Sequence, residues 1–189
     1  MRIHVMPVLV LWLLALSPVL GQRQRTTKWE SGELEKNQKI GIWEYYSYAG
    51  NGQQLVTQKY DHTANKLLYC RPDGKEYLVE VEPDKWERVL LTQPPWCVGG
   101  YETLASVMGK LRYPASAESH NVQGRVVVSF MIDTLGAVSG YKVMQGIGYG
   151  CDQEALRVAQ SMKALWVSGR LGSRALPTVY ELPFTFRLK

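Results

Sequence analysis

Residues suited to catalysis are scarce in this sequence. Of its 189 residues only three are histidine and three are cysteine, and no CxxC, HExxH or GxSxG motif occurs. His62 and His120, the histidines beyond the N-terminal segment, do not lie at a metal-ligand spacing from any cysteine. We therefore expect no catalytic residue, no metal and no cofactor, and a function in binding.

The small number of cysteines leaves their state open. Because Cys70, Cys97 and Cys151 are three, at least one stays unpaired in an oxidising compartment. One bridge between Cys97 and either of the others is one alternative, and three buried thiols packed as small apolar side chains are another. An enzyme that uses Cys97 or Cys151 as a nucleophile is a further hypothesis, which no motif favours.

Only one hydrophobic run is long, and it stands at the start of the chain. Arg2 precedes apolar residues 5–20, which Pro7 and Pro18 interrupt, and Val19-Leu20-Gly21 fits a cleavage site before Gln22. We interpret residues 1–21 as a signal peptide, so the mature chain is expected to be soluble and extracytoplasmic. An uncleaved membrane anchor is the second choice.

Charge is also not concentrated anywhere. The formal net charge of +5 is spread along the chain, which argues against nucleic-acid binding. Lys163, Arg170 and Arg174 are interpreted as solvated side chains. The nine prolines form no repeating tract, so the sequence contains no Pro-rich spacer.

Residues 22–93 have the pattern of a small antiparallel β-meander. Residues 22–28 are polar and expected to be loose, after which aromatic and β-branched runs flank turn residues at Ala49-Gly50-Asn51-Gly52 and again at Pro72-Asp73-Gly74. The aromatic side chains are expected to fill a thin sheet core and not to form a ligand platform; they are Trp43, Tyr45, Tyr46 and Tyr60.

Residues 94–189 follow the order helix, hairpin, helix, strand. Spacings of three and four predict a first helix ending before Pro114, with an apolar stripe of Tyr101, Leu104, Ala105, Met108 and Leu111. In "GRVVVSFMID" one face is fully apolar and the other half polar, which predicts a central strand; its apolar face is Val126, Val128, Phe130 and Ile132. Asp133 to Gly136 supplies a turn, and Gly140 a bulge in the returning strand.

The second helix and the last strand complete this part. Asp152 is expected to cap the helix and Glu154 to favour its positive end, with a buried stripe of Ala155, Ala159, Met162 and Leu165. The "GIGYG" before it is interpreted as a flexible turn and not as a phosphate loop, because the P-loop lysine is missing. The last strand alternates apolar and polar residues, and Pro183 places it at a sheet edge.

Two stretches resemble known families. "QKIGIWEYYS" and "KYDHTANKLLY" resemble MORN-like and YwqK-type hairpin repeats over about residues 28–70. From "PPWCVGGYETLASVMGKLRYPASA" through "VQGRVVVSFMIDTLGAV" and "GCDQEALRVAQSMKALW" to "LPTVYELPFTF", residues 94–189 resemble the C-terminal domain of TonB. Ser168 stands where this family often carries proline.

The TonB resemblance implies an α+β fold, a three-stranded antiparallel sheet with two helices on one side. It also implies a periplasmic protein, or an inner-membrane one if residues 1–21 are retained. Such a protein binds an extended peptide, the TonB box of an outer-membrane receptor, by strand addition. Without the Pro-rich spacer, we expect a recognition domain and no energy transduction, the alternative being an envelope adaptor or scaffold. A homodimer through the same edge stays open. The implied site is Thr178, Val179, Tyr180, Glu181, Leu182, Pro183, Phe184, Thr185 and Phe186.

Overall fold

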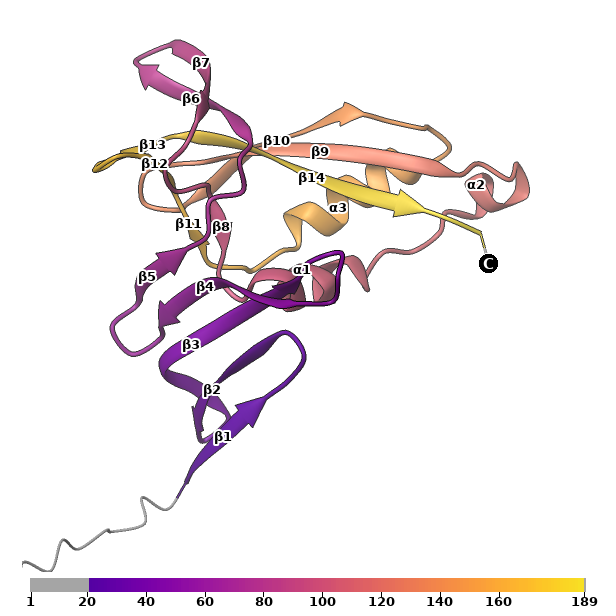
Figure 1. Cartoon of the computed structure of the whole chain (residues 1–189). Helices are drawn as coiled ribbons and strands as arrows, with labels where there is room; N and C mark the ends of the chain where they lie inside the picture. Colours follow the sequence, from indigo (N-terminus) through magenta and orange to yellow (C-terminus); the bar gives the residue numbers. More distant parts are fainter. Residues whose placement is uncertain (1–20, 189) are drawn as a thin grey trace, which may run out of the picture.

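A computed structural model of the chain describes residues 21–188, so the expected signal peptide lies almost wholly outside the described residues. The first part forms one five-stranded antiparallel meander, here called the N-terminal sheet (Figure 1). Its strands are β1 (Gln22–Thr26), β2 (Glu30–Glu35), β3 (Gln38–Tyr48), β4 (Gln54–Asp61) and β5 (Lys66–Cys70), in this order.

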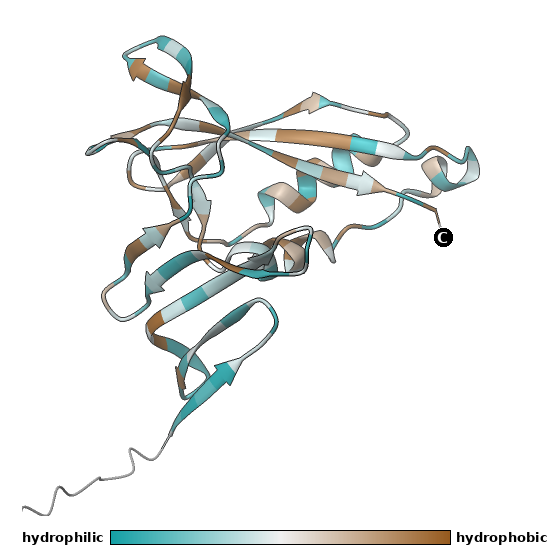
Figure 2. Cartoon of the chain, viewed as in Figure 1, coloured by the Kyte–Doolittle hydropathy of each residue, from teal (hydrophilic) through white to brown (hydrophobic). Residues whose placement is uncertain are grey.

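The expectation that residues 22–28 are loose is wrong. β1 pairs with β2 from Gln22 opposite Glu35 to Thr26 opposite Ser31. All five β1 side chains are exposed, so no apolar burial holds this strand, and no apolar alternation marks it in the sequence. Figure 2 shows β1 as a hydrophilic strand at the border of the sheet.

Aromatic side chains fill the core of the N-terminal sheet. Trp43, Tyr45 and Tyr60 are buried together with Leu34 and Val98, and the Trp43 indole nitrogen donates to the carbonyl of Glu33 over 3.0 Å. These three aromatic residues are core residues, as predicted. Tyr46, the fourth, lies half-buried beside Ser31, whose hydroxyl is 2.6 Å from the Tyr46 hydroxyl.

A second five-stranded sheet, here called the main sheet, carries the C-terminal part (Figure 1). Its order is β10 (Val138–Gln145), β9 (Gly124–Ile132), β14 (Thr178–Phe186), β6 (Glu76–Glu82) and β7 (Lys85–Leu90). The three strands expected within residues 94–189 are adjacent, but the sheet is larger than three strands because the β6–β7 hairpin joins β14. Pro72-Asp73-Gly74 therefore does not close a hairpin, since β5 and β6 belong to different sheets.

The β9–β14 ladder is the regular centre of the main sheet. It runs without a register shift from Gly124 opposite Phe186 to Ile132 opposite Thr178. The predicted apolar faces are confirmed, because a set of alternating side chains on both strands is buried: Val126, Val128, Phe130, Ile132, Leu182, Phe184 and Phe186. The turn into β10 is also as predicted: the Asp133 carboxylate accepts N–H groups of Leu135 and Ala137, and a register shift falls at Gly140.

Within residues 21–188 there are three helices: α1 (Gly100–Met108), α2 (Ala115–Ser119) and α3 (Cys151–Gln160). α3 covers one face of the main sheet, and α1 contacts both α3 and β3 of the N-terminal sheet (Figure 1). Of the predicted stripe, Ala155 and Ala159 on α3 and Met162 just after its end are buried, whereas Leu165 lies farther beyond the helix and is exposed.

Asp152 is not the N-cap of α3. Gly150 occupies that position with a φ of 86° and no side-chain cap. The Asp152 carboxylate instead accepts the N–H groups of Ile147 and Gly148 over 2.8 and 3.2 Å. Two main-chain donors of the "GIGYG" turn are thus bonded to a carboxylate of the chain itself, which agrees with a structural turn.

The α1 stripe was only partly predicted. Leu104, Met108 and Leu111 pack against the core, but Val107 is the buried side chain of the helix. Tyr101 is 56% exposed and does not pack in the main-sheet core; its ring instead contacts Trp29 of the N-terminal part, with ring centroids 4.3 Å apart. The helix therefore has two packing faces, one for each sheet.

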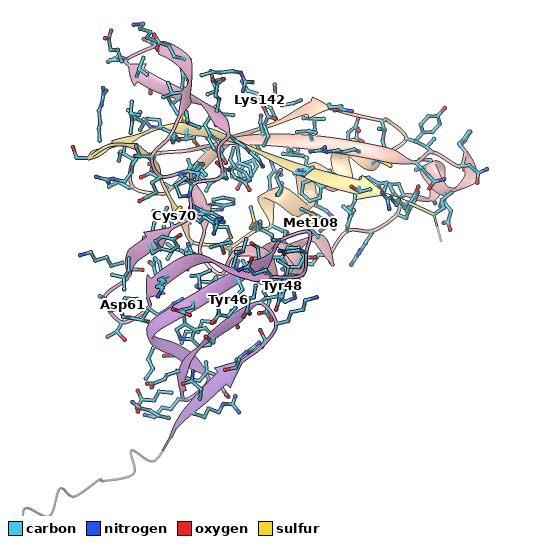
Figure 3. All side chains as sticks on the ribbon, in the orientation of Figure 1. Tyr46, Tyr48, Asp61, Cys70, Met108 and Lys142 are labelled. Carbon is cyan, nitrogen blue, oxygen red and sulfur yellow. The ribbon has the colours of Figure 1, made fainter. Side chains whose placement is uncertain are left out.

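Two further ladders have two strands each. They are β8 (Trp96–Cys97) with β11 (Trp166–Val167), and β12 (Gly169–Leu171) with β13 (Arg174–Leu176). All three cysteines are free thiols, so the disulfide alternative is wrong. Cys97 and Cys151 are buried core residues, and Cys70 is half-buried at the end of β5 (Figure 3).

Candidate strand-addition site on β14

The predicted edge strand is paired on both sides at its first residue. Thr178 lies opposite Ile132 of β9 and opposite Val79 of β6, and is fully buried. This is the single β6–β14 bridge. In the described part of the chain no strand pairs with residues 180–186 on the side away from β9, and we call this stretch the free edge.

One hydrogen bond fixes which main-chain groups the free edge presents. The Glu80 N–H donates to the Pro177 carbonyl over 3.0 Å, so Pro177 directs its main-chain groups toward β6. Because these groups alternate along a strand, those of Glu181, Pro183 and Thr185 point away from β9. The free edge thus offers the N–H groups of Glu181 and Thr185, together with the carbonyl groups of Glu181, Pro183 and Thr185.

Pro183 fits this alternation. Proline has no N–H to donate, and at position 183 the missing donor belongs to the free edge and not to the β9 ladder. A strand can keep its inner ladder complete with proline at such a position, and an outer proline hinders pairing with a second copy. The prediction of an edge strand from Pro183 agrees with the structure for residues 180–186 but not for Thr178.

Side chains of the free edge divide between two faces. Leu182, Phe184 and Phe186 point into the helix-covered core, and Tyr180 stacks on Trp166 with centroids 4.8 Å apart. Glu181 and Thr185 are exposed on the opposite face of the sheet. The core residues hold the strand rigidly while its outer main chain stays available.

A cleft of about 240 Å³ separates the start of β6 from β14, here called the hairpin cleft. Its charged side chains are three basic and two acidic: Lys75, Arg88, Arg125, Glu76 and Glu181. Among the described residues none of these five makes an ion pair. The cleft is therefore slightly positive, with its charges available to a ligand.

Two tyrosines line the helix-side wall of the hairpin cleft. Burial raises the pKa of Tyr180 to about 12. Burial, followed by the hydrogen bond that its hydroxyl donates to Asp73, also raises the pKa of Tyr77. Both hydroxyls consequently stay protonated at neutral pH and can only donate or accept hydrogen bonds.

An apolar groove of about 490 Å³ continues the cleft across the open face of the main sheet. It shares Leu78, Arg88, Val179 and Glu181 with the cleft, and its further lining includes Trp86, Met131 and Met144. Lys142 borders it on the side of the sheet away from α3 (Figure 3). A segment lying along the free edge would thus meet polar groups first and apolar ones farther in.

Other strand edges are less suited to accept a strand. β10 is interrupted by two register shifts, β1 is fully exposed with two arginines, and β7 carries Lys85, Glu87 and Arg88. Bulges and charged side chains are features that discourage edge pairing. The ladders behind β1 and β14 are both uninterrupted, but of these two strands only β14 also buries the side chains of one face.

Groups considered for catalysis lie in structural positions. Cys97 and Cys151 are 1% and 0% exposed, and burial raises the pKa of the Cys97 thiol to about 12 and also raises that of Cys151. His62 lies 2.6 Å from the Tyr45 hydroxyl in the N-terminal sheet. No group of three or more His, Cys, Asp or Glu side chains that could hold a metal occurs between residues 21 and 188.

The fold and edge together describe an α+β domain whose helices cover one sheet face and whose last strand offers unpaired main chain. Residues 109–188 match the family model described as "Gram-negative bacterial TonB protein C-terminal". This confirms the TonB resemblance for that stretch. No curated protein and no solved structure matches the chain. No helix among the described residues is long and apolar enough to cross a membrane.

Sequence analysis did not identify the residues that line the hairpin cleft opposite β14. Lys75, Glu76, Tyr77 and Arg88 come from a segment outside the matched stretch. The alternation in "EYLVEVE" marks a strand, but nothing local indicates that this strand joins β14. The MORN-like resemblance stays a prediction.

Proposed function

We propose that this protein is a TonB-like periplasmic protein that binds an extended peptide, the TonB box of an outer-membrane receptor, by strand addition to the free edge of β14. The observation that carries the proposal is the edge itself: an uninterrupted nine-residue strand, fully paired with β9, whose outer N–H groups at Glu181 and Thr185 have no strand partner in the described chain. In this mode main-chain hydrogen bonds supply affinity and side-chain pockets supply selectivity.

Removing one edge donor tests the proposal. Thr185→Pro deletes an N–H that points away from β9, so the β9–β14 ladder should survive as it does at Pro183, while peptide binding should weaken by several-fold. Thr185→Val is the matched control, since it removes the hydroxyl and keeps the N–H. Affinities for a TonB-box peptide can be measured by fluorescence anisotropy. Equal binding by Thr185→Pro, with a native circular dichroism spectrum, would contradict the proposal.

Binding without catalysis is part of the proposal. The thiols of Cys97 and Cys151 are buried with raised pKa values, so neither is poised as a thiolate nucleophile. Any hydrolytic activity of the purified protein that is lost in Cys97→Ala or in Cys151→Ala, with the fold retained by circular dichroism, would contradict this part.

An envelope adaptor without an energy-transducing role is the second candidate. It is favoured by β5, the other border of the N-terminal sheet, where Leu68 and Tyr69 are 46% and 41% exposed. A photo-crosslinking residue placed at position 68 or at position 181 distinguishes the two functions in cells. Capture of a partner protein from position 68, with no receptor captured from position 181, would favour the adaptor.

A further inference from the structure

The β6–β7 hairpin lies beside the free edge without covering it. After the bridge of Thr178 with Val79, β6 and β14 separate, and the hairpin cleft opens between Lys75 at the start of β6 and Pro183 of β14. The opening is therefore wedge-shaped, with a strand on each side.

Both sides of the wedge present main-chain groups. Because the Glu80 N–H bonds to the Pro177 carbonyl, alternation directs the main chain of Leu78 and Glu76 toward β14 as well. Glu76 thus faces the wedge from one side and Glu181 from the other. Since β6 and β14 are antiparallel, a segment between them is parallel to one wall and antiparallel to the other.

The hairpin is held firmly enough to act as a wall. Val79 is buried in a cluster with Leu91 and Leu176, and the Arg174 guanidinium donates to the Val81 carbonyl over 2.5 Å. These contacts anchor β6 to β13 and to the segment after β7. They lie on the closed side of the wedge, so the open side stays accessible.

Charge indicates what the wedge accepts. Arg88 projects from β7 opposite Leu78, and Arg125 lies on β9 opposite Thr185; both line the hairpin cleft and neither has an ion-pair partner among residues 21–188. Guanidinium groups bind carboxylates through paired hydrogen bonds. On the other side, the ring faces of Tyr77 and Tyr180 suit apolar side chains.

We propose that the β6–β7 hairpin is the second wall of the peptide site, and that the partner is an extended segment with an acidic side chain facing Arg88 and Arg125 and apolar side chains facing Tyr77 and Tyr180. This inference rests on the proposed strand addition to β14. It adds that a hairpin outside the matched domain takes part in binding and sets the selectivity.

Two peptides and two variants of the full chain test the inference. The peptides are a short extended sequence of alternating valine and threonine with one central Asp, and its Asn analogue. The unmodified protein should bind the Asp peptide at least about tenfold more tightly, the factor expected for a charged hydrogen bond. Arg88→Gln should lower this preference several-fold, with Arg125 still in place, and leave affinity for the Asn peptide unchanged. Lys66→Gln, the same charge change at an exposed position of β5, is the control and should bind as the unmodified protein does.

Amide exchange separates this inference from the proposed function. Two-sided binding predicts slower exchange at Glu76 as well as at Glu181 and Thr185. Slowing at Glu181 and Thr185 alone, with Arg88→Gln without effect, would overturn the second wall and leave strand addition standing. Faster exchange along β6 would mean that the peptide displaces the hairpin, which also overturns the inference. No change at any of these amides would overturn both.

Discussion

At the scale of single residues, Gly136 and Gly140 allow the stability cost of a steric clash to be distinguished from the cost of backbone strain alone. Both have positive φ, 89° at Gly136 and 66° at Gly140. A Cβ at Gly136 would lie 2.1 Å from the Trp166 carbonyl oxygen, whereas one at Gly140 meets nothing within 4 Å. We expect Gly140→Ala to cost about 1–2 kcal/mol and Gly136→Ala roughly 2–5 kcal/mol, measured by urea unfolding. Equal losses would show that the Gly136 turn does not pack on Trp166.

The buried thiol of Cys97 predicts an alkaline loss of stability. Burial raises its folded-state pKa to about 12, while the thiol in the unfolded chain has a pKa of about 8.5. The contribution of this thiol to the free energy of unfolding is therefore fully present below the unfolded-state pKa. It is lost as pH rises toward the folded-state pKa, by about 1.4 kcal/mol per pH unit in this window. Urea unfolding of the protein and of Cys97→Ala, each at about pH 8 and about pH 10, should show the smaller loss for the variant. Parallel losses would contradict burial of this thiol as the cause.

At the scale of elements, the β6–β7 hairpin depends on one small apolar cluster. Leu176 is 2% exposed and packs with Val79 and Leu91, so Leu176→Ala should destabilise the protein by about 2–5 kcal/mol and speed amide exchange in β6. Leu171→Ala, in the same β12–β13 ladder but at an exposed side chain, is the control and should cost less than about 1 kcal/mol. Similar costs for both substitutions would mean that the cluster does not hold the hairpin.

Element pairing also marks the limit of sequence-based prediction. The alternation along β9 and β14 identified both strands, their faces and the edge character of Pro183, because one side of each strand is buried in one core. The assignment of β6 to the main sheet was not predictable, since a partner about a hundred residues away leaves no local signal. β1 was missed for a related reason: its side chains are all exposed, so no apolar alternation marks its ladder with β2.

The candidate site was also only partly predictable from the sequence. Residues 180–186 came from the alternating pattern and the TonB resemblance, both properties of the C-terminal stretch. Arg88 and Tyr77 were not predicted, because a charged residue and a tyrosine on a short strand are ordinary surface residues until a second strand faces them. The pairing of Thr178 with Val79, which shortens the free edge, was not predicted for the same reason.

At the scale of the whole molecule, α1 and the segment before it join the two sheets. Val98 is buried in the core of the N-terminal sheet although it directly precedes α1. Trp29 stacks on Tyr101 of α1, and Arg25 of β1 lies 3.3 Å from the Glu102 carboxylate. The N-terminal sheet is therefore packed on the TonB-like part and is not a loosely tethered module.

This packing predicts one cooperative unfolding transition. Trp43 reports on the N-terminal sheet and Trp166 on the main sheet, so single-tryptophan variants that retain either residue should give coincident urea midpoints. Val98→Ala should lower both midpoints together. Two separated transitions in the single-tryptophan variants that keep Val98 would show that the sheets fold independently.

Residue-resolved amide exchange of residues 22–189, with and without a TonB-box peptide, tests the central claim most directly. The account predicts slower exchange at Glu181 and Thr185, the outward-facing donors of the free edge, and no change along the bulged edge of β10. Unchanged exchange at Glu181 and Thr185 under saturating peptide, or protection confined to another strand edge, would contradict strand addition to β14.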